Sequence, residues 1–147
     1  GSFLWCKLPS GRVLCFPYPK ILPGLYGPEL TYMTVPNEGS GTKLIADVKN
    51  SNNWARVSTY GGSLMQTTME AICRDLLADK MLELHEKGAN IVLHVHDEIV
   101  IEVGGNATTQ ETARAVMEKI MCTPPEWATG FPLRAECKVM QRYGKGK

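Results

Sequence analysis

Three consecutive polar residues, His96, Asp97 and Glu98, interrupt an otherwise apolar stretch and are the residues best suited to chemistry in this sequence. The stretch is NIVLHVHDEIVIEV, residues 90–103, in which every odd-numbered position except Asp97 holds Val, Leu or Ile. Because burying an unpaired carboxylate is costly, Asp97 must face solvent, form an ion pair or bind a cation.

Two interpretations of the acidic pair, Asp97 and Glu98, remain open. The first is that the two residues simply form the polar turn of a hairpin, since Asp is common in turns. The second is that their carboxylates are held at a tight turn to bind Mg²⁺ or Mn²⁺. Magnesium is often bound by one or two carboxylates together with substrate phosphates, which is the arrangement that phosphoryl transfer requires.

A third interpretation is a transition-metal site. His94 and His96 are two residues apart, so on a strand they would face one side and could bind zinc with a carboxylate as third ligand. A small metal hydrolase that uses His94, His96 and Asp97 is therefore an alternative. His85 is the one other histidine of the sequence, and an isolated His-x-His pair indicates zinc only weakly.

The elements that must position these residues follow from the apolar pattern. Residues 90–103 alternate with a period of two and are rich in Val and Ile, which predicts a β-hairpin turning at or near residues 96–98. Before it, residues 63–88 predict one long helix, with Ser63 as N-cap and Gly88 as C-terminal stop. The helix face expected to be buried consists of Met65, Met69, Ile72, Leu76, Leu77, Met81 and Leu84.

After the hairpin, Thr108 and Glu111 have the spacing of a capping box, which predicts a second helix ending before Pro124. Residues 126–129 predict a short helical turn, and alternation over 133–139 predicts a half-buried strand. The expected apolar stripe of the second helix is Ala113, Val116, Met117, Ile120 and Met121.

The N-terminal part predicts a hairpin over residues 3–16, an ordered loop over the proline-rich residues 17–28 and a short strand over 31–35. Residues 37–53 predict a surface insertion or hairpin tip, with a short strand over 44–48. The whole order predicts an α+β fold in which an antiparallel sheet, including the hairpin of residues 90–103, packs on two helices.

Composition limits the class of protein. The 147 residues suit one domain, and 16 Lys and Arg against 15 Asp and Glu give a net charge of +1, which argues against binding nucleic acid by phosphate neutralisation alone. Five cysteines without a CxxC pair predict ordinary thiols of a cytosolic protein, and no apolar run is long enough to span a membrane. Gly1 and Ser2 look like an expression scar, so the natural segment is expected to begin near Phe3 inside a longer protein.

The segment VLHVHDEIVIEV, residues 92–103, resembles motif C of family A DNA polymerases, in which two hydrophobic runs flank His-Asp-Glu in a hairpin of the palm. The helix segment MEAICRDLLADKML is similar to the helix that leads into motif C in that family. The bacteriophage branch of the family has similar stretches in the same order, namely FLWCKLPSGRVLCFPYP, TYMTV, TYGGSL and WATGFPLRAE.

This resemblance implies a DNA-directed DNA polymerase, a nucleotidyltransferase that uses Mg²⁺ or Mn²⁺ in DNA replication. Asp97 resembles the second catalytic aspartate, Glu98 the auxiliary metal-binding carboxylate, and His96 the histidine near the primer terminus. Glu70 stands where many members have a glutamine that contacts the minor groove at the terminal base pair. A carboxylate there accepts from the guanine amino group but cannot donate, and Gln66, one helical turn earlier, is a candidate substitute.

Two charged features have simpler explanations. Arg74 follows Glu70 by one helical turn, which predicts an ion pair on the helix surface. The basic C-terminal residues, among them Lys138 and Arg142, suit either contact with phosphates or a solvated, fraying tail.

The motif A strand and the fingers helix of family A enzymes have no counterpart before Leu64. The resemblance therefore implies the C-terminal part of a palm, inactive alone, whose partners are primer-template DNA, dNTP and the remainder of the polymerase, in cis or as a separate chain. The alternative is a non-catalytic remnant that binds DNA or a replication protein, with Asp97 left as a turn residue.

Overall fold

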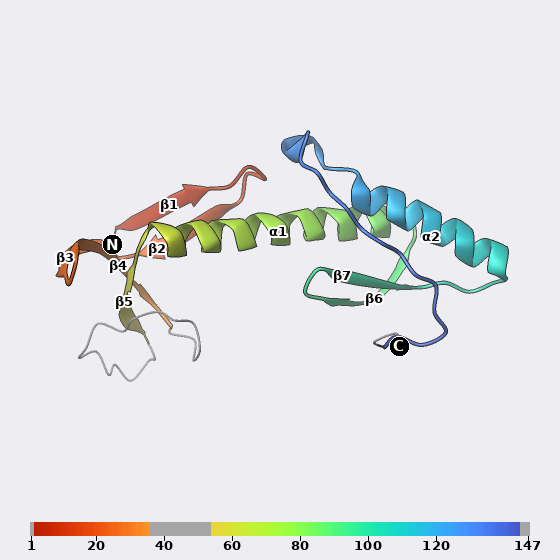
Figure 1. The fold of residues 1–147 in the computed structure, drawn as a ribbon, viewed down its shortest axis with the longest axis horizontal. Helices are drawn as coiled ribbons and strands as arrows, with labels where there is room; N and C mark the ends of the chain where they lie inside the picture. The colour runs from red at the N-terminus through yellow and green to blue at the C-terminus, as the bar shows by residue number, and fades with distance from the viewer. Residues whose placement is uncertain (1, 36–53, 145–147) are drawn as a thin grey trace. The chain divides into compact units, whose positions relative to one another are not determined.

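A computed structural model describes residues 2–35 and 54–144 (Figure 1). The chain divides into two compact units, Gly1–Ala71 and Ile72–Lys147. Within the described ranges, no helix is long and apolar enough to cross a membrane. The elements are β1 (Phe3–Lys7), β2 (Val13–Pro17), β3 (Lys20–Gly24), β4 (Gly27–Thr34), β5 (Ala55–Thr59), α1 (Gly61–Glu86), β6 (Asn90–Val95), β7 (Glu98–Glu102), α2 (Ala107–Cys122) and a 3₁₀ turn, η1 (Glu126–Ala128).

The first unit begins with the antiparallel hairpin β1–β2, as expected for residues 3–16. The turn is closed by two backbone hydrogen bonds, from the Leu8 amide to the Arg12 carbonyl at 2.8 Å and from the Gly11 amide to the Leu8 carbonyl at 2.9 Å. Gly11 has a φ of 90°, a left-handed conformation that glycine adopts without steric cost. Beyond β2, the Tyr18 amide donates to the Ser2 carbonyl at 2.9 Å.

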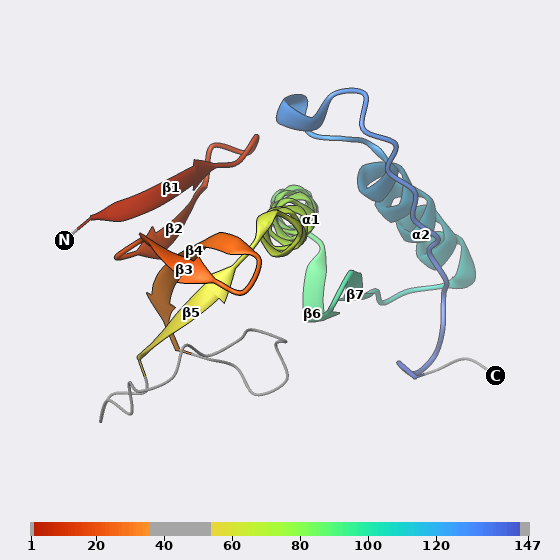
Figure 2. The ribbon, with the colours of Figure 1, turned by 60° about the vertical axis from the view of Figure 1, so that its left-hand side comes forward.

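The loop expected over residues 17–28 is wrong, because β3 and β4 form a second hairpin there. Pro23 and Pro28 lie directly opposite each other in its ladder. Opposite residues of an antiparallel pair alternate between hydrogen-bonded and non-hydrogen-bonded positions, and two facing prolines suit the second kind, where neither must donate across the ladder. β3 is also an edge strand of the sheet β3-β4-β5, shown in Figure 2.

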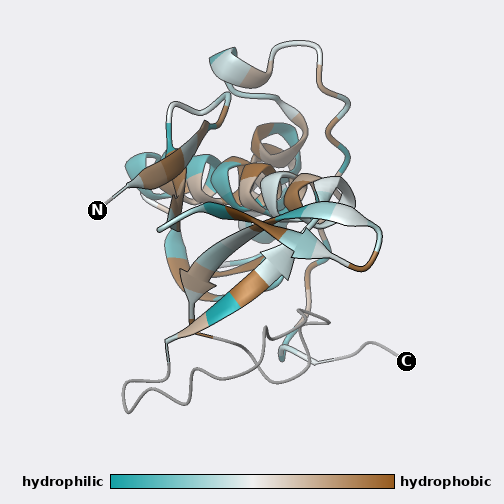
Figure 3. Cartoon of the chain, turned by 90° about the vertical axis from the view of Figure 1, so that its left-hand side faces the viewer, coloured by the Kyte–Doolittle hydropathy of each residue, from teal (hydrophilic) through white to brown (hydrophobic). Residues whose placement is uncertain are grey.

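The strand expected over residues 31–35 is confirmed as part of β4. Strand β4 also pairs with β5, which was not expected from the sequence. Val57 and Thr59 are buried at alternate positions of β5. Hydrophobic and hydrophilic bands follow one another along β5 in Figure 3. The insertion expected over residues 37–53, with its strand over 44–48, lies outside the described residues.

Helix α1 begins two residues before the expected N-cap. The Leu64 amide donates to the Tyr60 carbonyl at 3.0 Å, so the helical hydrogen bonds already include Tyr60. Ser63 therefore lies inside the first turn, and its assignment as N-cap is wrong.

The C-terminal end of α1 is stopped at Gly88, as expected. Gly88 has a φ of 81°, and its amide donates to the His85 carbonyl at 2.9 Å. The Ala89 amide donates to the Leu84 carbonyl at 3.0 Å, which completes the hydrogen-bond pattern of a Schellman motif. This cap turns the chain from α1 directly into β6.

The expected apolar face of α1 is buried only in part. Leu76, Leu77 and Leu84 are buried, whereas Met65 is 60% exposed and Met69 is 38% exposed. Helical spacing identifies residues that share a face, but whether that face is covered depends on the rest of the fold.

The second unit is built around a core in which α1, β7 and α2 each contribute buried side chains. The buried members are Leu77, Leu84, Ile99 and Ile120, and partly buried Met81, Ala89, Ile91, Ile101, Met117 and Met121 pack against them. The α+β class, the antiparallel pairing and the two helices thus agree with expectation. The described strands, however, form three separate sheets of two, three and two strands instead of one.

Helix α2 starts earlier than its expected capping box. Asn106 is the N-cap, and its Oδ1 accepts hydrogen bonds from the amide and the hydroxyl of Thr109, both at 3.0 Å. Thr108 therefore lies within the first turn, and Glu111 instead bonds Arg114. The capping box at Thr108 is wrong because Asn106 offers a better-placed acceptor.

The strand expected over residues 133–139 is also wrong, although the expected alternation is present up to Lys138; Val139, expected to face inward, is 50% exposed. Leu133, Ala135 and Cys137 are half-buried, while the residues between them are exposed. No strand in the described parts of the chain forms a ladder with this segment. Its backbone is held at Ala135 instead, whose amide donates to Cys122 Sγ at 3.3 Å.

Candidate functional site

The candidate site is the connection between β6 and β7. Val95 pairs with Glu98, so the turn consists of two residues, His96 and Asp97, and the expected hairpin turning at residues 96–98 is confirmed. His96 has a φ of 53°, and Tyr18 is the other non-glycine residue with positive φ among the described residues. This conformation costs an L-residue roughly 1–2 kcal/mol, so the backbone is strained at the site.

A β-bulge lies on the strand that leads to the turn. Ile91 pairs with Ile101, but Leu93 pairs with Val100, so Val92 is an extra residue on β6. The expected alternation is therefore broken before Asp97: Leu93 shares a face with Val100 and is 40% exposed. A bulge exchanges the two faces of the strand beyond it and redirects the side chains that follow, as often occurs beside functional sites.

The side chains of His96, Asp97 and Glu98 are all exposed. Glu98 Oε2 accepts a hydrogen bond from the Tyr143 hydroxyl at 2.9 Å. No side chain in the described ranges forms a hydrogen bond or an ion pair with the Asp97 carboxylate. The turn thus presents two adjacent carboxylates to solvent, one of them fixed by a neutral donor.

These two carboxylates fit a hard divalent cation whose remaining ligands come from elsewhere. Magnesium keeps several waters and is commonly bound by one or two carboxylates with substrate phosphates. The described residues contain no group of three or more His, Cys, Asp or Glu side chains arranged to hold a metal ion. The turn therefore fits part of a shared magnesium site and not a complete protein cage.

The proposed histidine ligands of a zinc hydrolase are not placed as the sequence suggested. His94 lies on β6 opposite Ile99, whereas His96 is in the turn with a positive φ. Alternation along a strand does not extend through a turn, so their spacing no longer places the two rings on one side. The hydrolase interpretation has no supporting ligand set among the described residues.

Gln66 and Glu70, the candidate DNA-contacting residues, are exposed on α1 and bonded to each other. Gln66 Nε2 donates to Glu70 Oε1 at 2.9 Å. The expected ion pair of Glu70 with Arg74 is not among the ion pairs of the described residues. Gln66 and Glu70 belong to the first unit, and the turn belongs to the second.

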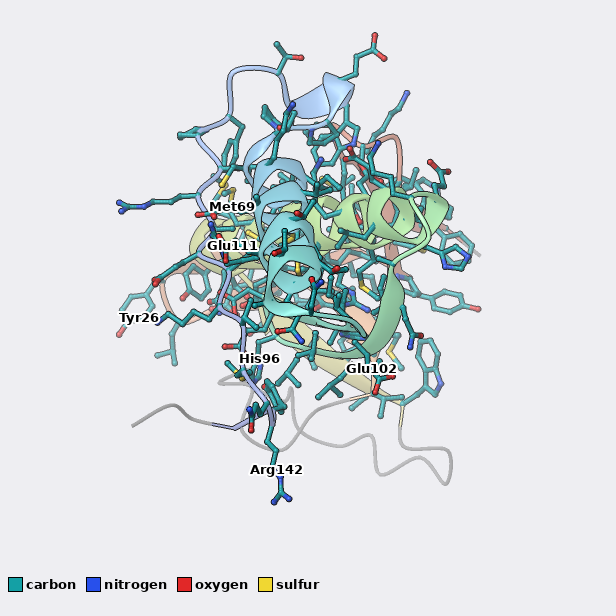
Figure 4. The ribbon with its side chains drawn as sticks, turned by 90° about the vertical axis from the view of Figure 1, so that its right-hand side faces the viewer. Tyr26, Met69, His96, Glu102, Glu111 and Arg142 are labelled. Carbon is teal, nitrogen blue, oxygen red and sulfur yellow. The ribbon has the colours of Figure 1, made fainter. Side chains whose placement is uncertain are left out.

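Tyr143 is the residue that sequence reasoning missed. It lies in the basic segment expected to fray, and nothing in its sequence neighbourhood points to Glu98, 45 residues away. The hydrogen bond to Glu98 raises the pKa of the Tyr143 hydroxyl above its ordinary value. Figure 4 labels His96 at the turn and Arg142, which precedes Tyr143 in this segment.

Comparison with known proteins gives one informative similarity. No protein-family model and no solved structure matches the chain. The chain is similar to the DNA polymerase of Bacillus phage SP02, with 38% identity over 147 residues. The aligned region includes 99% of this chain but 20% of that polymerase, so the chain spans about a fifth of the length of its relative.

Proposed function

We propose that this chain is the C-terminal part of the palm of a family A DNA polymerase, and that the β6–β7 turn is its motif C. The observation that best supports the proposal is the exposed Asp97 at a two-residue turn, without a side-chain partner among the described residues. The similarity to a phage DNA polymerase along nearly the whole chain supports the proposed reaction class.

In this proposal, Asp97 and Glu98 hold Mg²⁺ or Mn²⁺ together with the motif A aspartate of the remaining polymerase. Bound divalent ions activate an attacking hydroxyl and stabilise the charge on leaving phosphate oxygens. Asp97 aligns the primer 3′-hydroxyl with the α-phosphate of the dNTP through this shared site. Glu98, fixed by Tyr143, is the auxiliary ligand.

His96 and the pair on α1 are proposed to contact DNA. The strained turn displays the His96 ring in solvent next to Asp97, where the primer terminus would lie. Glu70 accepts from a guanine amino group in the minor groove, and the amide of Gln66 has a second N–H to donate. The hydrogen bond between them lets Gln66 supply the donor that Glu70 lacks.

The remainder of the polymerase is the required partner in this proposal, because the chain corresponds to 20% of its relative. Without motif A and the fingers, the isolated chain is expected to be inactive. Primer-template DNA and dNTP bind only to the assembled enzyme, in the cytoplasm of a bacterium or of a phage-infected host.

The test is primer extension with Mg²⁺, comparing this chain alone with the chain mixed with an upstream fragment that contains motif A and the fingers. We expect extension only in the mixture. Asp97→Asn should reduce nucleotide incorporation by orders of magnitude, because the substitution removes a ligand charge at nearly constant volume. Glu86→Gln, which removes an exposed carboxylate at the end of α1, is the matched control and should retain activity within a few-fold.

Absence of extension with a well-folded upstream fragment would favour the non-catalytic remnant. Activity of the Asp97→Asn mixture within a few-fold of the unmodified mixture would contradict the catalytic role of Asp97 specifically. The first outcome concerns the class of protein, and the second concerns only the role of Asp97 in catalysis.

A further inference from the structure

The hydrogen bond between Tyr143 and Glu98 joins two distant parts of the second unit. The phenol donates to Glu98 Oε2 at 2.9 Å, across 45 positions of the sequence. Among the described residues, no other side-chain hydrogen bond links the turn residues 96–98 to a different element. The orientation of the Glu98 carboxylate therefore depends on one external donor.

The segment that provides this donor is held in place upstream. Beyond α2, the Phe131 amide donates to the Ala128 carbonyl at 2.9 Å. Farther along, the Ala135 amide donates to Cys122 Sγ at 3.3 Å. Tyr143 thus ends a segment that is bonded to the end of α2.

The chemical type of the donor matters for a cation site. A Lys or Arg at this position would form an ion pair with Glu98 and compete with a metal ion for the carboxylate. A neutral phenol fixes one oxygen, Oε2, and leaves the negative charge and the second oxygen available. Hydrogen bonds of this kind orient metal ligands and lower the entropy lost when the ion binds.

We propose that Tyr143 is a positioning residue, which orients the Glu98 carboxylate so that the β6–β7 turn binds a divalent cation. The inference rests on the proposed function in one respect, namely that this turn is the cation site. Tyr143 itself contacts neither the cation nor the substrate in this role and acts only through Glu98.

The test uses the whole 147-residue chain, labelled with ¹⁵N and titrated with MnCl₂. Bound Mn²⁺ broadens the amide signals of nearby residues, so binding at the turn is read from residues 95–100. The unmodified chain should show selective broadening there, and Tyr143→Phe should need several-fold more Mn²⁺, near the lower end of the ~10–100-fold losses seen for such supporting residues. Tyr26→Phe removes an equivalent hydroxyl from a tyrosine that is 99% exposed and should change nothing.

A double-mutant cycle distinguishes positioning through Glu98 from a general structural effect. In a Glu98→Gln background, Tyr143→Phe should have no further effect on Mn²⁺ binding. An equal loss in both backgrounds, or an unchanged titration of Tyr143→Phe, would overturn the positioning role while leaving the turn as a cation site. Failure of the unmodified chain to show selective broadening at residues 95–100 would overturn the inference, whereas the proposed function is tested independently by primer extension in the mixture with the upstream fragment.

Discussion

The hairpins β1–β2 and β6–β7 each contain a residue in the left-handed conformation at the turn, but the residue types differ. The β1–β2 turn contains Pro9, Ser10 and Gly11, and the left-handed position is taken by glycine with a φ of 90°. The β6–β7 turn is made of His96 and Asp97, and His96 takes the left-handed conformation with a φ of 53°. The first turn has residues that favour its backbone, whereas the second accepts strain to present polar side chains, which is typical of functional sites.

The two hairpins also differ in what they bury. β7 places Ile99, 8% exposed, in the core of the second unit. β1 leaves Phe3 46% and Trp5 59% exposed, with their ring centroids 5.5 Å apart. The strained turn is thus attached to β7, which places one buried residue in the core, whereas the unstrained turn joins β1, whose aromatic rings are exposed, to β2, whose Phe16 is buried. Core packing can offset the strain at His96.

The largest expected effect tests this difference in burial. Ile99→Ala should lower the free energy of unfolding of the second unit by about 2–4 kcal/mol, because it removes buried methyl groups and leaves a cavity. Leu4→Ala on β1, where the side chain is 38% exposed, should cost its own unit less than half as much. Urea denaturation can be followed by the fluorescence of Trp127 for the second unit and of Trp5 for the first, each as the sole tryptophan. Equal losses at the two positions would contradict the comparison.

The next effect tests the turn of β1–β2. Gly11→Ala should destabilise the first unit by roughly 1–2 kcal/mol, because a side chain is strained at this φ. No atom lies within 4 Å of the added Cβ, so a loss would come from the backbone and not from a clash. Gly104→Ala, which also meets open space but has no positive φ, is the matched control and should be nearly neutral. A neutral Gly11→Ala in the Trp5 fluorescence assay would show that this turn tolerates strain as the other does.

Sequence reasoning was most accurate where structure is determined by neighbouring residues. The turn at residues 96–98 follows from polar residues between two β-prone runs, and the stop at Gly88 follows from a glycine after a helical pattern. Both features need only local backbone chemistry. Local reasoning gave the wrong N-cap at Ser63, because the helical hydrogen bonds begin at Tyr60, before that residue.

The features that the sequence did not reveal depend on distant partners. Pro23 lies in a strand that pairs with β4, where Pro28 faces it, and residues 133–139 form no strand because no described strand pairs with them. The bulge at Val92 could not be predicted from the sequence, because it lies in a run of apolar residues that suit either face of the strand. The bond from Tyr143 to Glu98 spans 45 positions and follows from the folded path of the chain. The turn that carries the candidate ligands was therefore predictable, but the hydrogen bond that holds Glu98 was not.

The smallest expected effect tests the strain at the β6–β7 turn directly. His96→Gly should relieve the left-handed strain, whereas His94→Gly, on strand β6, should cost about 0.5–1 kcal/mol because glycine is unfavourable within a strand. We therefore expect His96→Gly to unfold at a higher urea concentration than His94→Gly in the Trp127 assay. If His96 contacts the primer terminus as proposed, His96→Gly should nevertheless reduce primer extension by the reassembled polymerase. Greater stability with lower activity would mean that the strain at His96 is retained for its side chain, whereas a loss of stability equal to that of His94→Gly would mean that the turn is not strained.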